Sequence, residues 1–192
     1  PEAVYEYQPP ATQPVFSGDR ALEMVQAQVN FGPRNPNSEG HERCFVFLKE
    51  FFEASSAKVR IQEFPINGYD GERLRLKNIF AQFNPDAKIR VLLAAHWDTR
   101  PRADWEKDEA KKETPILGAN DGASGVGVLM HLAEVLSTYP PPVGVDILLV
   151  DGEDYGREGD EAMYCLGAKY FSATLPPEYD AQFGILLDLV GD

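Results

Sequence analysis

The sequence predicts an α/β domain of three layers, in which a mixed, centrally parallel sheet lies between helices. Three short apolar runs, residues 91–95, 147–150 and 185–187, are typical of buried parallel strands. Helical patterns lie between these runs, as connections between parallel strands require. Each run ends at residues that commonly bind metals. A chain of 192 residues suits one domain with a sizeable core.

The first part of the chain predicts an arm, two helices and two strands. Residues 1–16 contain several prolines and are expected to form an extended arm. A helix is then predicted from Ser17 to about Val29, and a second from Ser38 to about Ala54, because both serines are good N-caps. Alternating apolar residues predict strands at residues 59–64 and 74–83.

The second part of the chain alternates strands with helices. The charged stretch 100–117 predicts a long loop, for which a solvated surface is the favoured interpretation and a lid is the alternative. Around this loop we expect a fully buried strand at 89–95, a helix at 123–137, a strand at 145–151, a helix at 162–174 and a buried strand at 183–189.

Composition argues against two classes of protein. The formal net charge is −13, whereas nucleic-acid binding needs a basic face, so nucleic acid is not an expected partner. No run of about 18 apolar residues occurs, so no membrane span is expected. The two cysteines, Cys44 and Cys165, could pair, but one bridge is no disulfide framework, and a buried free thiol is expected for each.

The candidate chemistry lies where the apolar runs end. In open α/β sheets the carboxyl ends of the strands border the crevice that binds ligands. Carboxylates gathered there are costly unless a cation, a proton or hydrogen bonds offset their repulsion, and zinc is the natural candidate. The residues that meet this description are His96, Asp98, Asp121, Glu153, Asp154 and Asp188.

Each acid also has a simpler explanation when it is taken alone. Asp121 stands where a helix N-cap is expected, and capping by itself would explain it. Glu153 and Asp154 could be surface acids at the end of a strand. Asp188 could simply be exposed, if its strand ends at Leu187. The functional interpretation therefore depends on these acids occurring together.

The histidines differ in their expected roles. His96 follows a buried strand, where a neutral imidazole is a good zinc ligand that a carboxylate such as Asp98 can orient. His41 and His131 lie within predicted helices, and we expect both to be structural. Because the chain has only 3 histidines, a histidine at the end of a buried strand is a notable candidate for a metal ligand.

Several motifs in succession resemble those of a known superfamily. They are His96-Trp97-Asp98, Gly118 to Gly125, Asp151 to Asp154, and Leu187 to Gly191. In this order they resemble the motifs of the zinc aminopeptidase and glutaminyl cyclase superfamily, over about residues 20 to 191. Val29 to Arg34, Ser38 to His41 and Leu186 to Gly191 look more specifically like the glutaminyl cyclase branch.

The resemblance implies a role for each site residue. Asp121 would be a zinc ligand, bridging if two ions bind, and Asp154 a second ligand at a position where the family more often has Glu. Glu153 would be the general acid and base. Asp188 would handle protons in a cyclase or bind a second metal in a peptidase. His96 would be a ligand only if two metals bind.

The implied activity is that of a zinc-dependent glutaminyl-peptide cyclotransferase, which forms N-terminal pyroglutamate and releases ammonia. This reading implies one Zn²⁺ ion and a peptide substrate that is bound by its N-terminus. The alternatives are a zinc aminopeptidase with two Zn²⁺ ions, which hydrolyses N-terminal residues from peptides, and a catalytically silent relative that binds peptides.

The resemblance also gives an expectation about the extent of the chain. The family has a further metal-binding histidine in its C-terminal portion, whereas no histidine follows His131. We therefore expect residues 17–192 to be the N-terminal part of a zinc exopeptidase-like catalytic domain, incomplete at the C-terminus. Because the chain begins at Pro1, we also expect that a leader is removed and that the protein is exported to the periplasm or the exterior, or lipid-anchored.

Overall fold

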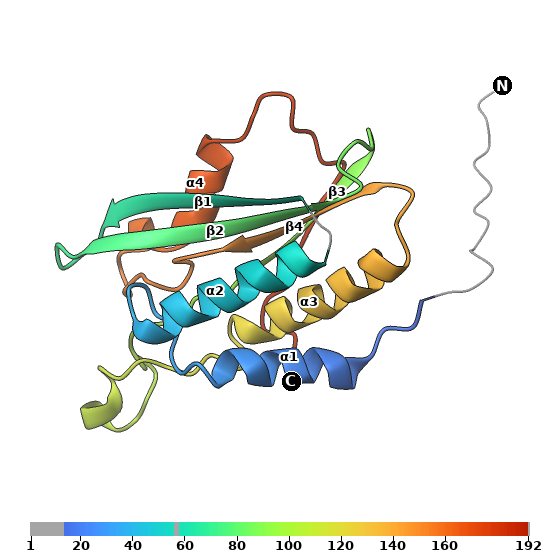
Figure 1. Cartoon of the computed structure of the whole chain (residues 1–192). Coiled ribbons are helices and arrows are strands. Elements are labelled where there is room, and N and C mark those ends of the chain that lie inside the picture. The colour runs from blue at the N-terminus through green and yellow to red at the C-terminus, as the bar shows by residue number, and fades with distance from the viewer. Residues whose placement is uncertain (1–13, 56–57, 192) are drawn as a thin grey trace.

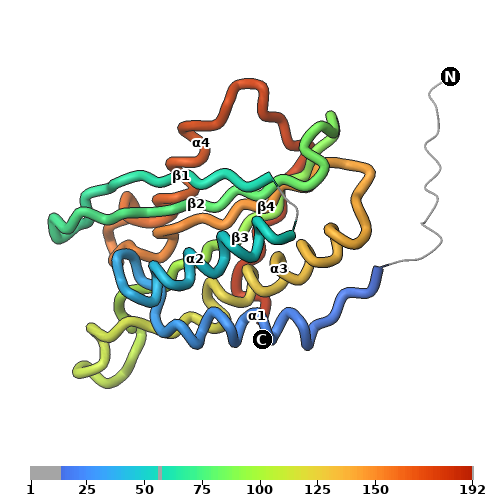
Figure 2. Tube along the Cα trace, in the orientation of Figure 1, coloured from blue at the N-terminus to red at the C-terminus, as the bar shows by residue number. Residues whose placement is uncertain are grey.

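The computed structural model describes residues 14–55 and 58–191, so the predicted arm lies mostly outside the described residues. The strands form one sheet with helices on both faces, which confirms the predicted three-layer arrangement (Figures 1 and 2). The elements are α1 (Gly18–Val29), α2 (Glu39–Ala54), β1 (Lys58–Asn67), β2 (Arg73–Phe83), β3 (Arg90–His96), η1 (Glu109–Lys111), α3 (Ala123–Thr138), β4 (Gly144–Val150), η2 (Glu161–Met163), α4 (Leu166–Ala173) and β5 (Gly184–Leu186).

Serine caps start the first two helices, as the sequence predicts. The hydroxyl of Ser17 accepts a hydrogen bond from the backbone N–H of Arg20 at 3.2 Å, and that of Ser38 accepts one from His41 at 3.1 Å. In the described part of the chain, no helix is long and apolar enough to cross a membrane.

The register of the sheet brings the candidate site together. The strand order is β1-β2-β4-β3-β5, in which β3 pairs in parallel with both β4 and β5, while β1 and β2 are antiparallel. His96 lies opposite Val150, and Ala94 lies opposite Leu186. The carboxyl ends of β3, β4 and β5 therefore meet at one edge of the sheet.

Two strands are less buried than predicted. In β3 the middle residues are only half-buried, and β5 is three residues long, with Ile185 49% and Leu186 68% exposed. Among the described residues β5 pairs only with β3, so it is an edge strand with one unpaired side. Helix α4 is also shorter than predicted, because residues 161–163 form a 3-10 turn and Cys165 adopts a left-handed φ of 54°.

A buried tryptophan fixes the segment between two site residues. Trp97 is fully buried under α2, where its ring stacks on His41 with 4.4 Å between the ring centroids. Its indole N–H donates to the carbonyl of Lys77 at 3.1 Å. Because Trp97 separates His96 from Asp98, this packing fixes the backbone that carries both side chains.

Glycines allow α3 to approach the carboxyl edge of the sheet closely. A Cβ atom at Gly125 would overlap the carbonyl oxygen of Leu187 and lie 3.1 Å from Cβ of Ala95. Gly122, at φ 87°, would bring a Cβ within 2.7 Å of the carbonyl oxygen of Asp98. The small first turn of α3 thus holds the helix against β3 and the segment after β5.

We predict that Gly125→Ala destabilises the protein, because the added methyl must push α3 away from the Leu187 backbone. Overpacking of this kind costs about 1–3 kcal/mol. The control is Gly18→Ala at the exposed start of α1, where no atom lies within 4 Å of the added Cβ and no loss is expected. Urea denaturation of both variants checks the prediction, and equal midpoints would contradict it.

Candidate metal centre and active site

Three predicted site residues lie together at the carboxyl edge of the sheet. His96 Nε2 is 3.0 Å from Asp121 Oδ1 and 3.6 Å from Asp188 Oδ1. One ligand atom from each residue lies within 4.8 Å of the others. His96 ends β3, Asp121 precedes α3 and Asp188 follows β5, so three separate segments contribute. Imidazole nitrogen and carboxylate oxygen are ligands that zinc accepts.

The state of His96 fits a metal ligand. Both of its ring nitrogens are buried and face carboxylates, with Nε2 3.0 Å from Asp121 Oδ1 and Nδ1 3.5 Å from Asp98 Oδ1. Burial opposes protonation, but the carboxylates of Asp121 and Asp98 outweigh it and hold the pKa of His96 well above its usual value. A cation beside Nε2 would replace that proton and satisfy the nitrogen.

Asp121 does not cap the helix that it precedes. The N-cap of α3 is Gly122, and no side chain makes a capping hydrogen bond there. The capping explanation from the sequence is therefore wrong, because α3 starts at Ala123 as predicted and its N-cap position is occupied by Gly122, at a left-handed φ of 87°. The hydrogen-bonding contact with His96 lowers the pKa of Asp121, so this carboxylate is ionised beside the imidazole.

Asp188 is partly exposed and also lies beside His96, so each of the two interpretations left open by the sequence is partly correct. Its strand ends at Leu186, and its side chain is 43% exposed, as the simpler interpretation expected. The carboxylate nevertheless lies beside His96, in the group of three potential ligands. The exposed side of Asp188 gives the group contact with solvent, which a site that exchanges ligands needs.

Asp98 links the end of β3 to the turn after β4. Its two oxygens accept hydrogen bonds from the backbone N–H groups of Glu153 and Asp154, at 3.0 and 3.2 Å. The carboxylate is fully buried. Asp98 therefore fixes the turn that carries both acids and also faces the ring of His96.

We predict that Asp98→Asn destabilises the metal-free protein by about 1–3 kcal/mol, because an amide NH₂ would face a backbone N–H that needs an acceptor. The control is Asp86→Asn, which removes the same charge from an exposed turn and should leave stability unchanged. Urea denaturation in the presence of chelator measures both. A stability equal to that of the parent would mean that Asp98 does not hold the turn.

Glu153 has a half-buried carboxylate next to a cysteine thiol. Cys165 Sγ lies 3.4 Å from Glu153 Oε1 as a hydrogen-bond donor, and the Cys165 N–H donates to the Glu153 carbonyl at 2.9 Å. Burial raises the pKa of Glu153, while the charge of His96 opposes the rise. The carboxylate of Glu153 thus lies in a partly desolvated position within electrostatic reach of His96 and Asp188.

The two cysteines are free, so the thiol beside Glu153 can report on that carboxylate. Cys44 is buried as expected, and burial raises its pKa to about 12. Cys165 is only half-buried, and its pKa is raised by burial and then by the charge of Glu153.

We predict that Glu153→Gln lowers the pKa of Cys165 and speeds its alkylation by iodoacetamide about threefold at mildly alkaline pH, because the thiolate is the reacting form. Glu158→Gln removes an exposed acid from the same segment and serves as the control. Mass spectrometry of the modified chain gives both rates, and an unchanged or slower rate in Glu153→Gln would contradict the prediction.

Asp154 is held apart from the group of three. Arg100 Nε and Nη2 lie 2.9 and 2.7 Å from Asp154 Oδ1, whereas Asp154 Oδ2 is buried without a hydrogen-bond partner in the described residues. Burial raises the pKa of Asp154 to about 6, despite Arg100, and the charge of Asp121 adds to the rise. Asp121 and Asp154 are thus electrostatic neighbours, and a shared ion stays a prediction.

Sequence reasoning missed two arginines at the site. Arg100 occupies one oxygen of Asp154, and nothing in the charged stretch distinguished it. Arg34 is fully buried, and its guanidinium donates to the carbonyls of Trp97, Leu117 and Gly118 at 3.0, 2.8 and 2.8 Å. It thereby holds the segments at both ends of the loop 100–117. The sequence did not predict this role, because nothing in the Gly-Pro-Arg turn distinguishes a buried arginine from an exposed one.

The two remaining histidines are structural, as predicted. His41 Nε2 lies 2.9 Å from Asp151 Oδ2, and both side chains are fully buried. His131 Nε2 accepts the backbone N–H of Ser17 at 2.9 Å, and Nδ1 contacts Glu134 at 3.0 Å. Neither histidine belongs to the group of potential metal ligands.

Two cavities border the loop 100–117 beside the candidate centre. One, of about 520 Å³, is lined by Arg100 and Asp121 among others, and the other, of about 350 Å³, includes Arg100 and Tyr164. Trp105 lines both and is 88% exposed. The predicted loop therefore forms walls next to the candidate chemistry.

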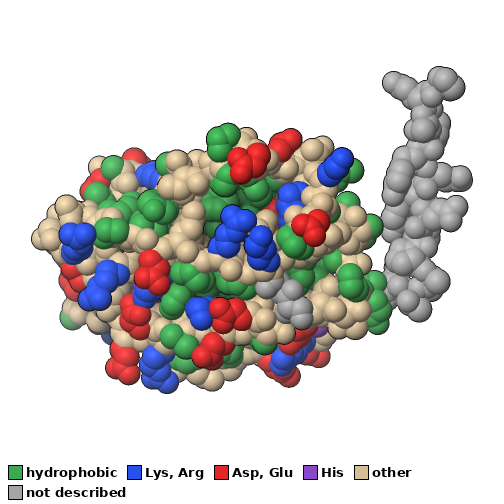
Figure 3. Space-filling model, turned by 45° about the horizontal axis from the view of Figure 1, so that its top comes forward, with side chains coloured by type: hydrophobic (Ala, Val, Ile, Leu, Met, Phe, Trp, Pro, Cys, Tyr) green, Lys and Arg blue, Asp and Glu red, His purple; other side chains and the backbone are tan. Residues whose placement is uncertain are grey.

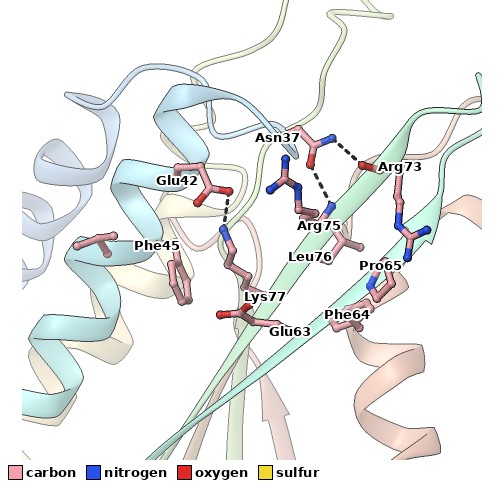
Figure 4. Close-up of a pocket in the computed structure, with 11 residues that line it drawn as sticks. Asn37, Glu42, Phe45, Glu63, Phe64, Pro65, Arg73, Arg75, Leu76 and Lys77 are labelled. Carbon is pink, nitrogen blue, oxygen red and sulfur yellow. Dashed lines mark hydrogen bonds and ion pairs between the residues drawn. The ribbon is translucent and has the colours of Figure 1, made fainter.

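A larger cavity, of about 740 Å³, lies between α2 and the β1–β2 hairpin (Figure 4). Lys77 Nζ contacts Glu42 there at 2.5 Å, and Asn37 bonds the backbone of Arg73 and Arg75. None of the predicted site residues lines it.

On the face seen in Figure 3, basic and acidic side chains are interspersed, so the excess of acidic residues is not concentrated on this face.

The chain belongs to peptidase family M28, whose model matches residues 78–192. It resembles a glutaminyl cyclase from Bacteroides thetaiotaomicron, solved with N-acetylhistamine bound, at 45% identity and a TM-score of 0.88 over 94% of this chain. It also resembles a Zn-dependent exopeptidase from Parabacteroides distasonis, at 41% identity and a TM-score of 0.89 over 93% of this chain.

A leucine aminopeptidase precursor from Bacteroides thetaiotaomicron is similar to the same degree, at 46% identity and a TM-score of 0.88 over 93% of this chain. The chain spans 64% of the length of the cyclase, 63% of the exopeptidase and 64% of the aminopeptidase precursor. Its relatives are thus cyclases and exopeptidases of one family, which supports an enzyme.

Proposed function

We propose that the protein is a zinc-dependent glutaminyl-peptide cyclotransferase, which converts an N-terminal glutamine of a peptide into pyroglutamate and releases ammonia. The observation that carries this proposal is the half-buried carboxylate of Glu153 within electrostatic reach of His96 and Asp188, in a chain whose sequence is 45% identical to a glutaminyl cyclase of similar fold. In a one-ion cyclase, Asp121 and the buried free oxygen of Asp154 would hold zinc, whereas His96 and Asp188 would become ligands only if a second ion is bound.

Zinc, when bound, supplies a Lewis acid that polarises the side-chain carbonyl of the terminal glutamine. Glu153 accepts a proton from the α-amine while its nitrogen bonds to the side-chain carbon. The same carboxyl group then gives the proton to the amide nitrogen, whose bond to that carbon breaks, and ammonia leaves. Asp98 keeps Glu153 in place through the backbone, and Asp188 shares in the movement of protons.

A zinc aminopeptidase is the second candidate, and one observation favours it. His96, Asp121 and Asp188 supply three potential ligands without Asp154, which leaves Asp154 for a second ion. A neighbour described as a leucine aminopeptidase precursor supports the same reading. In that reaction Glu153 would take a proton from water rather than from the amine of the substrate.

We predict that Glu153→Gln lowers ammonia release from a glutaminyl peptide by about 10²–10⁴-fold, which is the usual contribution of a general base. The assay uses the full natural chain loaded with zinc, with Glu158→Gln as the matched control that should keep parent activity. Undiminished ammonia release by Glu153→Gln would rule out the assigned role.

The same assay separates the candidate functions. Ammonia release without free amino acids supports the cyclase, and release of free amino acids supports the aminopeptidase. Zinc content gives a second test, since one ion per chain agrees with the cyclase and two agree with the peptidase. Chelator should abolish either activity, whereas a silent relative gives neither product.

A further inference from the structure

The carboxylate of Asp154 is held in an asymmetric way. Arg100 Nε donates a hydrogen bond to Oδ1 at 2.9 Å and Nη2 lies 2.7 Å from the same oxygen, while Oδ2 is buried and has no hydrogen-bond partner in the described part of the chain. An arginine that pairs with a carboxylate in the bidentate manner gives one N–H to each oxygen. Here both guanidinium nitrogens face one oxygen, and the other oxygen is left free.

The position of Arg100 is itself fixed by its surroundings. Its Nη2 donates to the Tyr164 hydroxyl at 3.2 Å, and its Nη1 lies 3.4 Å from Asp104 Oδ2. The carbonyl of Arg100 accepts the N–H of Ile116 at 3.2 Å, which closes the base of the loop 100–117. The guanidinium, with its side chain only 17% exposed, is therefore a rigid holder of Asp154.

The free oxygen lies in surroundings that call for a cation. Asp121 and Asp98 act on the Asp154 carboxylate as like charges, so a cation at the free oxygen would offset their mutual repulsion. The backbone N–H of Asp154 is bound by Asp98, which fixes the backbone from which the carboxylate projects. As a purely structural ion pair the arrangement would be poor, because it leaves a buried acceptor unsatisfied.

We propose that Arg100 is a positioning residue, which holds Asp154 by one oxygen so that the other oxygen is free to bind a metal ion. This inference rests on the proposed function, because it needs the metal centre of which Asp154 is a part. It assigns a role to the first residues of the loop 100–117, since Arg100 connects that loop to a metal ligand.

The rival explanation makes the opposite prediction. If Arg100 only neutralised Asp154 in the absence of metal, it would compete with zinc and repel it. Removal of the guanidinium would then tighten zinc binding. If Arg100 orients the carboxylate, its removal weakens zinc binding, as the loss of groups that orient metal ligands usually does, by about 10–100-fold.

The test measures the affinity of the full natural chain for zinc alone, by competition with a chromogenic chelator. We expect Arg100→Gln to bind zinc about 10–100-fold more weakly than the parent. We expect Arg100→Lys, which keeps the charge but not the planar pair of donors, to lose a similar amount. The control is Arg20→Gln on α1, where Arg20 pairs with Glu23 and Glu134 away from the candidate centre, and it should bind as the parent does.

Each outcome decides the matter. Parent-like or tighter binding by Arg100→Gln, or parent-like binding by Arg100→Lys, would overturn the positioning role while leaving the metal centre standing. If the parent itself bound no zinc, the proposed function and this inference would both fall. Tyr164→Phe removes only one contact of Arg100, so it remains informative if Arg100→Gln does not fold; a smaller loss of affinity supports the role, and no loss overturns it.

Discussion

A single buried carboxylate connects the two strand ends on which the candidate chemistry depends. The parallel pairing of β3 with β4 brings His96 level with Val150, but pairing alone does not fix the turn that follows β4. Asp98 does so by accepting the N–H groups of Glu153 and Asp154. Because the same carboxylate lies 3.5 Å from His96 Nδ1, it places a negative charge beside the imidazole while it holds the turn.

The sequence predicted those parts of the fold that local patterns determine. The serine caps, the fully buried β4 and the parallel order of the three apolar runs follow from side-chain spacing and hydrophobicity. The meeting of His96, Asp121 and Asp188 follows from the rule that parallel strands end at one edge. These predictions needed no knowledge of distant partners.

The features that the sequence could not supply depend on contacts between distant segments. The exposure of β5 depends on what packs beside it, which an apolar run does not reveal. The left-handed φ of Cys165 delays the start of α4 to Leu166, and the left-handed φ of Gly122 makes this glycine, rather than Asp121, the N-cap of α3. Arg34 and Arg100 bind groups more than fifty positions away, and neither lies in a pattern that distinguishes a buried arginine from a surface one.

Arg34 has a further consequence, because its three bonds to Trp97, Leu117 and Gly118 close the loop at its base. The residues between those anchors, including the exposed Trp105, therefore form a loop whose two ends are fixed. Insertions in a surface loop with secured ends add little entropic cost. The length and sequence of this loop can therefore change at little cost in stability, and such changes would reshape the two cavities that the loop lines without moving its anchors.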